Sequence, residues 1–252
     1  MGIVHGNRNG HNRHTKLIYL ENYELLDCKA NIIEVANKDN RITIFLDQTI
    51  FYPQGGGQPY DKGVISSNSS KFIVEEVRFI DGVVHHMGRF EHGSFSSNEV
   101  VECFVDKERC ILNSKLHSAG HVVDYAVSKI KSAWIPIKGY HFPEGPYVEY
   151  EGSSDETDKE KLRSDIEIAC NQTLKENIKP KLLFINKGEM ASICRHVPEN
   201  MPENKPSRVV VFGDFGVPYG GTHVSSLSDI GHITIRNIKA KAGNVRVGYD
   251  IK

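Results

Sequence analysis

The chain has 252 residues, of which 39% are hydrophobic and 25% are charged. This balance is typical of a globular protein with one or two domains. The formal net charge is −1 at pH 7, so no overall positive field draws nucleic acid to the surface, and any such contact must come from a local patch. No apolar run approaches the roughly 18–20 residues of a membrane-spanning helix, which excludes that class.

The cysteine content points to a reducing compartment. Five cysteines are an odd number, and no Cys-x-x-Cys pair occurs among them. Both observations argue against a disulfide scaffold. We therefore expect free thiols and a cytoplasmic protein. The cysteines are Cys28, Cys103, Cys110, Cys170 and Cys194.

Residues 1–16 differ in composition from the rest of the chain. They are rich in Gly, Asn, His and basic residues, contain no acid and show no hydrophobic period, which predicts a flexible leader. A basic leader without acids also fits an organelle transit peptide, although this one has no serine and little amphipathic character.

Residues 17–105 carry short apolar runs of alternating character, separated by turn residues such as Asp81 and Gly82. Runs of this length predict an antiparallel sheet or a small barrel. We expect a first, β-barrel-like domain over 17–105. Its strands are expected at residues 31–35, 41–46, 63–66, 71–80, 83–87 and 100–105.

A glycine-rich loop interrupts this pattern. Gly55, Gly56 and Gly57 are consecutive, and such a run is unsuited to the interior of a strand. It predicts a loop that another group approaches closely; a turn at a barrel corner is the alternative.

Residues 106–252 predict an α+β domain of helices packed on an antiparallel sheet. Asp106 is a candidate N-cap for a helix with apolar residues at positions 116, 119, 123, 127 and 130. A second helix is expected at 155–177 and a short one at 187–193. Strands are expected at 134–142, 147–150, 181–185, 208–212, 231–239 and 244–251.

Three histidines suggest a metal site. His117 and His121 lie one helical turn apart and therefore share a face. His223 follows Gly220 and Gly221, which permit a tight turn toward a partner element. Three imidazoles fit a zinc site that keeps a position open for water or substrate. A His-x-x-x-His pair is also common without a metal. Asp124, three residues after His121, could orient an imidazole or simply be solvated.

Three segments in order resemble a known family: residues 49–63 (TIFYPQGGGQPYDKG), 115–123 (KLHSAGHVV) and 218–224 (PYGGTHV). Together they resemble the editing domain of alanyl-tRNA synthetases and the free-standing AlaX-type trans-editing proteins. The resemblance implies an ATP-independent hydrolase that protects translation fidelity by deacylating mischarged tRNA, chiefly Ser-tRNA(Ala) or Gly-tRNA(Ala). It implies one zinc ion on His117, His121 and His223, which would also be the catalytic residues, and the acceptor end of tRNA(Ala) as partner.

The chain departs from the family at three positions. Tyr219 stands where the family's loop has a cysteine ligand, so zinc is expected to be held more weakly. Gly120 stands where many relatives have Thr, and Ile137 where the synthetase domain often has Gln. Both changes remove a polar group from the expected substrate pocket. We therefore expect Thr49, Gln58 and Thr222 to contribute substrate recognition beside Gly120 and Ile137.

Two other functions fit the same residues. One is a non-catalytic tRNA-binding module that has lost the cysteine ligand, and the other is a metal-dependent hydrolase of a small ester. Contact with the acceptor stem would need basic residues near the site or on the closing strands. The candidates are Lys129, Lys131, Lys138, Arg236, Lys239, Lys241 and Arg246.

Overall fold

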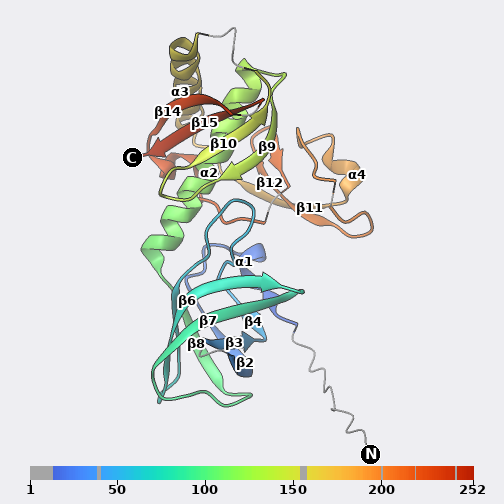
Figure 1. The fold of residues 1–252 in the computed structure, drawn as a ribbon. Coiled ribbons are helices and arrows are strands. Elements are labelled where there is room, and N and C mark those ends of the chain that lie inside the picture. Colours follow the sequence, from blue (N-terminus) through green and yellow to red (C-terminus); the bar gives the residue numbers. More distant parts are fainter. Residues whose placement is uncertain (1–13, 39–40, 154–157, 200, 219, 242) are drawn as a thin grey trace, which may run out of the picture.

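The structure is a computed structural model that describes residues 14–252, except 39–40, 154–157, 200, 219 and 242. It combines a closed barrel with further sheets and helices, and a long helix, α2, runs between the two parts (Figure 1). The expected mixture of helices with antiparallel sheets and a barrel is confirmed. A domain boundary near Val105 stays a prediction.

Six antiparallel strands close the barrel in the order β2-β3-β7-β6-β5-β8. Closure leaves no free edge between these strands. Inward-facing side chains such as Ile32, Ile44 and Phe72 are fully buried and fill the interior. The predicted strands all appear, and two of them are longer than expected. Their bounds are β2 Asp27–Lys38, β3 Arg41–Leu46, β5 Gly63–Ser66, β6 Lys71–Ile80, β7 Val83–His92 and β8 Val100–Val105.

The end of the expected leader is part of the fold. Strand β1 (Lys16–Leu17) pairs in parallel with β4 (Gln48–Thr49), and α1 (Ile18–Glu21) follows it. Thr15 is buried and donates a hydrogen bond to the Leu46 carbonyl at 2.8 Å. The leader prediction was therefore wrong for Thr15 and Lys16, because pairing with a barrel segment satisfies their backbone. Residues 1–13 lie outside the described part of the chain.

Helix α2 (Lys107–Ile130) begins where the sequence predicted. The Asp106 side chain accepts a hydrogen bond from the Arg109 backbone N–H at 3.1 Å, as an N-cap does. The predicted apolar stripe, represented by Leu116, Ala119 and Val123, is buried. Burial of this stripe fixes the rotation of α2 and so decides where its histidines point.

A four-stranded antiparallel sheet packs against α2 in the order β14-β15-β10-β9. Tyr150 and Tyr249 are fully buried between sheet and helices. The bounds are β9 Ile135–Tyr140, β10 Tyr147–Glu151, β14 Ile233–Lys241 and β15 Asn244–Ile251.

A three-stranded sheet in the order β11-β12-β13 is formed by the segment between β10 and β14. The loop that carries His223 follows its last strand. Strand β13 (Phe215–Val217) was not predicted, and helix α4 (Lys187–Met190) is shorter than expected. A 3₁₀ turn, η1 (Leu227–Ile230), follows the loop. The other strands are β11 Lys181–Ile185 and β12 Ser207–Phe212.

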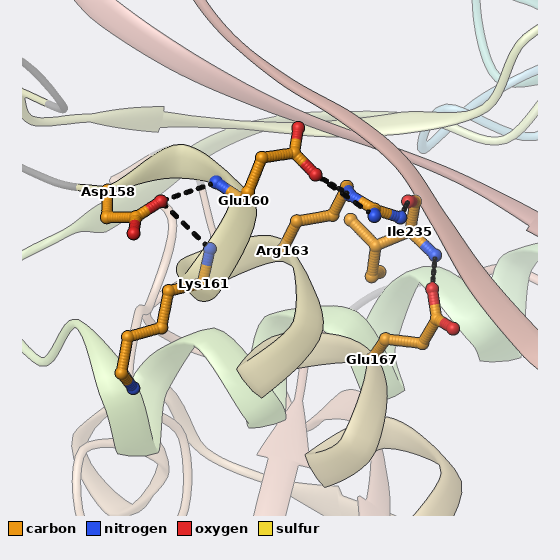
Figure 2. A network of polar contacts seen from close by, with 6 residues as sticks. All are labelled: Asp158, Glu160, Lys161, Arg163, Glu167 and Ile235. Atoms are coloured by element: carbon orange, nitrogen blue, oxygen red, sulfur yellow. Dashed lines mark hydrogen bonds and ion pairs between the residues drawn. The ribbon is translucent and has the colours of Figure 1, made fainter.

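Helix α3 (Lys159–Lys175) covers the outer edge of β14 (Figure 2). The Ile235 carbonyl accepts a hydrogen bond from Arg163 at 3.3 Å, and the Ile235 N–H donates to Glu167 at 2.8 Å. One turn further, Asn171 bonds both backbone groups of Ile233. These side chains take the place of a neighbouring strand and protect the edge from pairing with another chain. The helix starts at the Asp158 N-cap.

All five cysteines are free thiols, as expected. Within the described ranges, the helices are all too short or too polar to cross a bilayer.

Candidate functional site

His117, His121 and His223 meet in the interior. Helix α2 contributes the first two, and the loop after β13 contributes the third. Each offers one ring nitrogen, and these three atoms all lie within 4.8 Å of one another. The side chains are 0%, 7% and 3% exposed, respectively. The predicted triad therefore exists as a compact, buried cluster.

Gln58, from the glycine-rich loop, fixes the protonation of His117. Its Oε1 accepts a hydrogen bond from the Thr222 backbone N–H at 3.0 Å, which sets the orientation of the amide. The same oxygen lies 2.7 Å from Nδ1 of His117. An amide oxygen only accepts, so Nδ1 carries the proton and Nε2 keeps its lone pair for a metal. Gln58 thus orients a ligand in the way that outer partners of metal-binding histidines do.

His223 has a comparable partner in Ser118. The Ser118 hydroxyl oxygen accepts from the Val224 N–H at 3.1 Å and lies 3.2 Å from Nδ1 of His223. Because Ser118 occupies Nδ1, Nε2 of His223 is the nitrogen left for the cluster. The Nε2 atoms of His117 and His223 are buried and have no hydrogen-bond partner among the described residues.

The loop that carries His223 approaches α2 closely. A Cβ atom on Gly221 would lie 1.8 Å from Cε1 of His117, so no other residue fits there. Arg208 donates a hydrogen bond to the Gly221 carbonyl at 2.9 Å and holds this backbone in place. The absence of a side chain at Gly221 is therefore a condition for bringing His223 to the helix.

The electrostatics favour neutral imidazoles. Burial, with repulsion from neighbouring imidazoles and Arg208, holds the pKa of His117 well below its usual range. Burial likewise holds the pKa of His121 and His223 well below that range. At neutral pH all three offer lone pairs, the form that binds a metal. Three neutral ring nitrogens within 4.8 Å of one another are a donor set that could hold one zinc ion.

A cavity of about 470 Å³ opens beside His121. The predicted residues Gly120 and Ile137 line it, together with Gly57 of the glycine-rich loop and Tyr140 of β9. The expectation that this loop leans over the histidine site is confirmed, because Gln58 contacts His117 and Gly57 borders the cavity. The volume fits a small chemical group rather than a protein segment.

The other predicted recognition residues lie elsewhere. Thr222 is buried and accepts hydrogen bonds from Gln58 and Ser114, both at 2.8 Å, so it supports the loop. Thr49 lies inside the barrel 2.8 Å from Nε2 of His86 and is not part of the cavity lining. Tyr219 lies outside the described residues.

His141 was not predicted to belong to the site. Its ring stacks on His117 with the centroids 4.8 Å apart, and it lies 2.7 Å from the Tyr249 hydroxyl. Burial lowers its pKa to about 3, so it too is neutral. Gly120 leaves room for it, since a Cβ there would lie 2.3 Å from the His141 ring. One histidine in a predicted strand gave no spacing signal that could have identified it.

Among the predicted basic residues whose side chains the structure describes, Lys138 alone lines the cavity. Arg236 and Arg246 pair with Asp250 and Glu149 on the sheet. Arg195 and His196, which the sequence did not single out, supply further basic character to the lining.

The chain resembles proteins that handle alanyl-tRNA. Residues 11–109 match the family model described as tRNA synthetases class II (A). The chain is 28% identical to the alanyl-tRNA editing protein AlaX-L of Pyrococcus horikoshii over 231 residues, which are 90% of this chain and 55% of that protein. It is 30% identical over 230 residues to the alanine–tRNA ligase of Methanobrevibacter smithii, covering 88% of this chain and 25% of the ligase. The alanine–tRNA ligase of Haloquadratum walsbyi is 25% identical over 243 residues, 88% of this chain and 24% of the ligase. The chain thus spans about half the length of the AlaX-L protein and a quarter of the ligases.

Proposed function

We propose that the chain is an AlaX-type editing protein and that it hydrolyses the ester bond of mischarged tRNA in trans. The substrates we propose are Ser-tRNA(Ala) and Gly-tRNA(Ala), and the compartment is the cytoplasm. The observation that carries the proposal is the buried triad of His117, His121 and His223 beside a cavity of about 470 Å³.

We propose zinc as the ion of this triad. The donor set consists of neutral, buried imidazoles, two of which have Nε2 atoms without a hydrogen-bond partner in the described part of the chain. Three protein ligands are typical of catalytic zinc, which polarises a carbonyl and makes water more acidic when it is bound.

The surrounding residues supply orientation. Gln58 holds Nδ1 of His117 protonated, and the Ser118 hydroxyl contacts Nδ1 of His223. Thr222 fixes the Gln58 amide through two hydrogen bonds. Such outer partners align the ligands before substrate arrives, which lowers the reorganisation that the reaction requires.

The cavity wall favours a small aminoacyl group. Gly120 and Ile137 contribute no polar side-chain atoms, and Tyr140 and Phe142 add aromatic surface beside them. The two rings stack with their centroids 4.5 Å apart. A wall of this kind accepts seryl and glycyl groups, but it separates them only modestly because apolar contacts discriminate weakly.

The test is deacylation of purified aminoacyl-tRNAs. We expect hydrolysis of Ser-tRNA(Ala) and Gly-tRNA(Ala), loss of activity in His121→Ala, and retention of activity in His232→Ala, which removes an exposed histidine. Binding of tRNA without turnover would identify a non-catalytic module instead. Hydrolysis of small esters without dependence on tRNA would identify a general metal-dependent hydrolase.

A further inference from the structure

A buried carboxylate faces the cavity next to the triad. Asp124 is only 9% exposed, yet it borders the cavity, and it is the one acidic side chain among the described lining residues. The sequence left it either as a partner of an imidazole or as a solvated group, and solvation is excluded by its burial. A charged group in such a position calls for a cationic or donating partner.

The neighbours of Asp124 do not satisfy all of the hydrogen-bonding capacity of its carboxylate. Its Oδ1 lies 3.9 Å from Nη1 of Arg195, too far for a hydrogen bond, and accepts none from the described residues. Arg195 directs other donors to the carbonyls of Ser132 and Trp134. Burial raises the pKa of Asp124 from 3.8 to about 6, with Arg195 and a hydrogen bond from the Tyr150 hydroxyl opposing the rise. The group is thus mainly ionised at neutral pH, and its side chain keeps 12% exposure where it borders the cavity.

The position of Asp124 suits a specific part of the substrate. It follows His121 by three residues on α2, so the two side chains share a face about 5–6 Å apart at Cβ. In an aminoacyl ester, one carbon separates the carbonyl from the α-ammonium group. When the ester carbonyl lies at the triad, the ammonium group can therefore lie beside Asp124, one helical turn after His121.

We infer that the Asp124 carboxylate binds the α-ammonium group of the esterified amino acid. This inference rests on the proposed function and adds a specificity determinant to it. The other charged groups of the lining, Lys138 and Arg195, repel an ammonium ion. A charge-assisted hydrogen bond from the ammonium group to the carboxylate restricts the site to esters with a free α-amine.

The test compares Ser-tRNA(Ala) with N-acetyl-Ser-tRNA(Ala), which lacks the cationic amine, in wild type, Asp124→Asn and Asp165→Asn. Asp165 is a partly exposed acid of α3 paired with Lys161 and serves as the matched control. In Asp124→Asn we expect kcat/KM for the free amine to fall about 10- to 150-fold, the range of a hydrogen bond to a charged group. The N-acetylated ester should change little, and Asp165→Asn should behave as wild type.

Equal slowing of both esters in Asp124→Asn would show a structural role and overturn the inference alone. Failure of wild type to hydrolyse either ester would overturn the proposed function and the inference with it. A second test needs no variant and therefore remains valid if Asp124→Asn does not fold: two small inhibitors are compared on the wild-type protein. Serinamide should inhibit at least about 10-fold more strongly than N-acetylserinamide, and equal inhibition would contradict the inference.

Discussion

At Gln58 a single amide joins the glycine-rich loop to the histidine site. Its oxygen accepts from both His117 and the Thr222 backbone, and its nitrogen donates to the Thr222 hydroxyl. Every polar atom of the group is directed by a neighbour, so the amide has one orientation. This constraint passes to His117, whose Nε2 is turned toward the cluster.

Replacing Gln58 by Met keeps the volume but removes both hydrogen-bonding atoms. We expect zinc affinity to fall about 10- to 100-fold, the usual effect of losing a partner behind a metal-binding histidine. Competition with a chromophoric chelator measures the change. Gln48→Met is the control, because that amide bonds only to the Lys29 carbonyl near the barrel surface. Unchanged affinity in Gln58→Met would show that the amide does not orient His117.

Gly221 and Gly220 differ in the space that surrounds them. Because a Cβ on Gly221 would lie 1.8 Å from His117, Gly221→Ala should displace the loop, abolish zinc binding and lower the free energy of unfolding by about 1–3 kcal/mol, as overpacking does. A Cβ on Gly220 would lie 3.6 Å from Leu20, an ordinary contact. Gly220→Ala should therefore keep its zinc. Zinc content and urea denaturation distinguish the two variants, and equal behaviour would refute the close approach.

Asp61 should make stability depend on pH. Burial raises its pKa from 3.8 to about 7, although the Tyr52 N–H and Arg109 oppose the rise. The folded state therefore favours the protonated form. This contribution is complete below the unfolded-state pKa and is lost as pH rises through about 7.

We expect the free energy of unfolding of wild type to fall by about 1–3 kcal/mol relative to Asp61→Asn between pH 5 and pH 8. Asn keeps an oxygen that can accept from the Tyr52 N–H. Urea denaturation at the two pH values measures the difference. Asp81→Asn, in an exposed turn, should show no such trend relative to wild type. A constant difference between wild type and Asp61→Asn would contradict the account.

At the scale of elements, α2 packs against β9 and β15 through a mutual fit of Gly120, His141 and Tyr249. A Cβ on Gly120 would lie 2.3 Å from the His141 ring and 2.9 Å from the Tyr249 hydroxyl. His141 therefore occupies space that a threonine, the residue of many family members, would need. Side chains at positions 120 and 141 therefore compete for the same space.

This coupling predicts a non-additive pair. Gly120→Thr alone should destabilise the fold by about 1–3 kcal/mol, whereas the same change in a His141→Ala background should cost clearly less. Urea denaturation of the four proteins gives the interaction energy. Strict additivity would show that His141 does not fill the space beside Gly120.

Local pattern predicted the elements better than the site. Strands β3, β5, β6, β8 and β11 have the predicted bounds, because alternation and turn residues are local signals. Strand β13 has three residues and gave no period. Pairing of β1 with β4 depends on a distant partner, so the leader prediction ran two residues too far.

The triad was predicted because helical spacing and the family's order of motifs both pointed to it. The places of Thr49, His141 and Asp124 could not be predicted, since they depend on how sheets and helices pack. Thr49 faces a barrel interior that His86 shares, and Asp124 borders a cavity that exists only once β9 and the segment around Arg195 lie beside α2. The sequence alone does not tell which of the polar residues near a motif face the ligand.

At the scale of the molecule, the site is assembled from distant segments. The barrel part supplies Gln58, α2 supplies two histidines, and the loop after β13 supplies His223. The contact between Gln58 and Thr222 joins residues 164 positions apart. Formation of the histidine cluster therefore requires the barrel part and the second part to pack together.

The most direct measurement is the rate of Ser-tRNA(Ala) hydrolysis after zinc is removed and restored. Chelation should reduce the rate by about two orders of magnitude or more if a zinc ion on the three histidines would polarise the ester carbonyl, and one equivalent of zinc should restore it. His121→Ala should stay inactive after zinc addition, and His232→Ala should recover as wild type does. Full activity in the zinc-free protein, or in His121→Ala, would contradict the account.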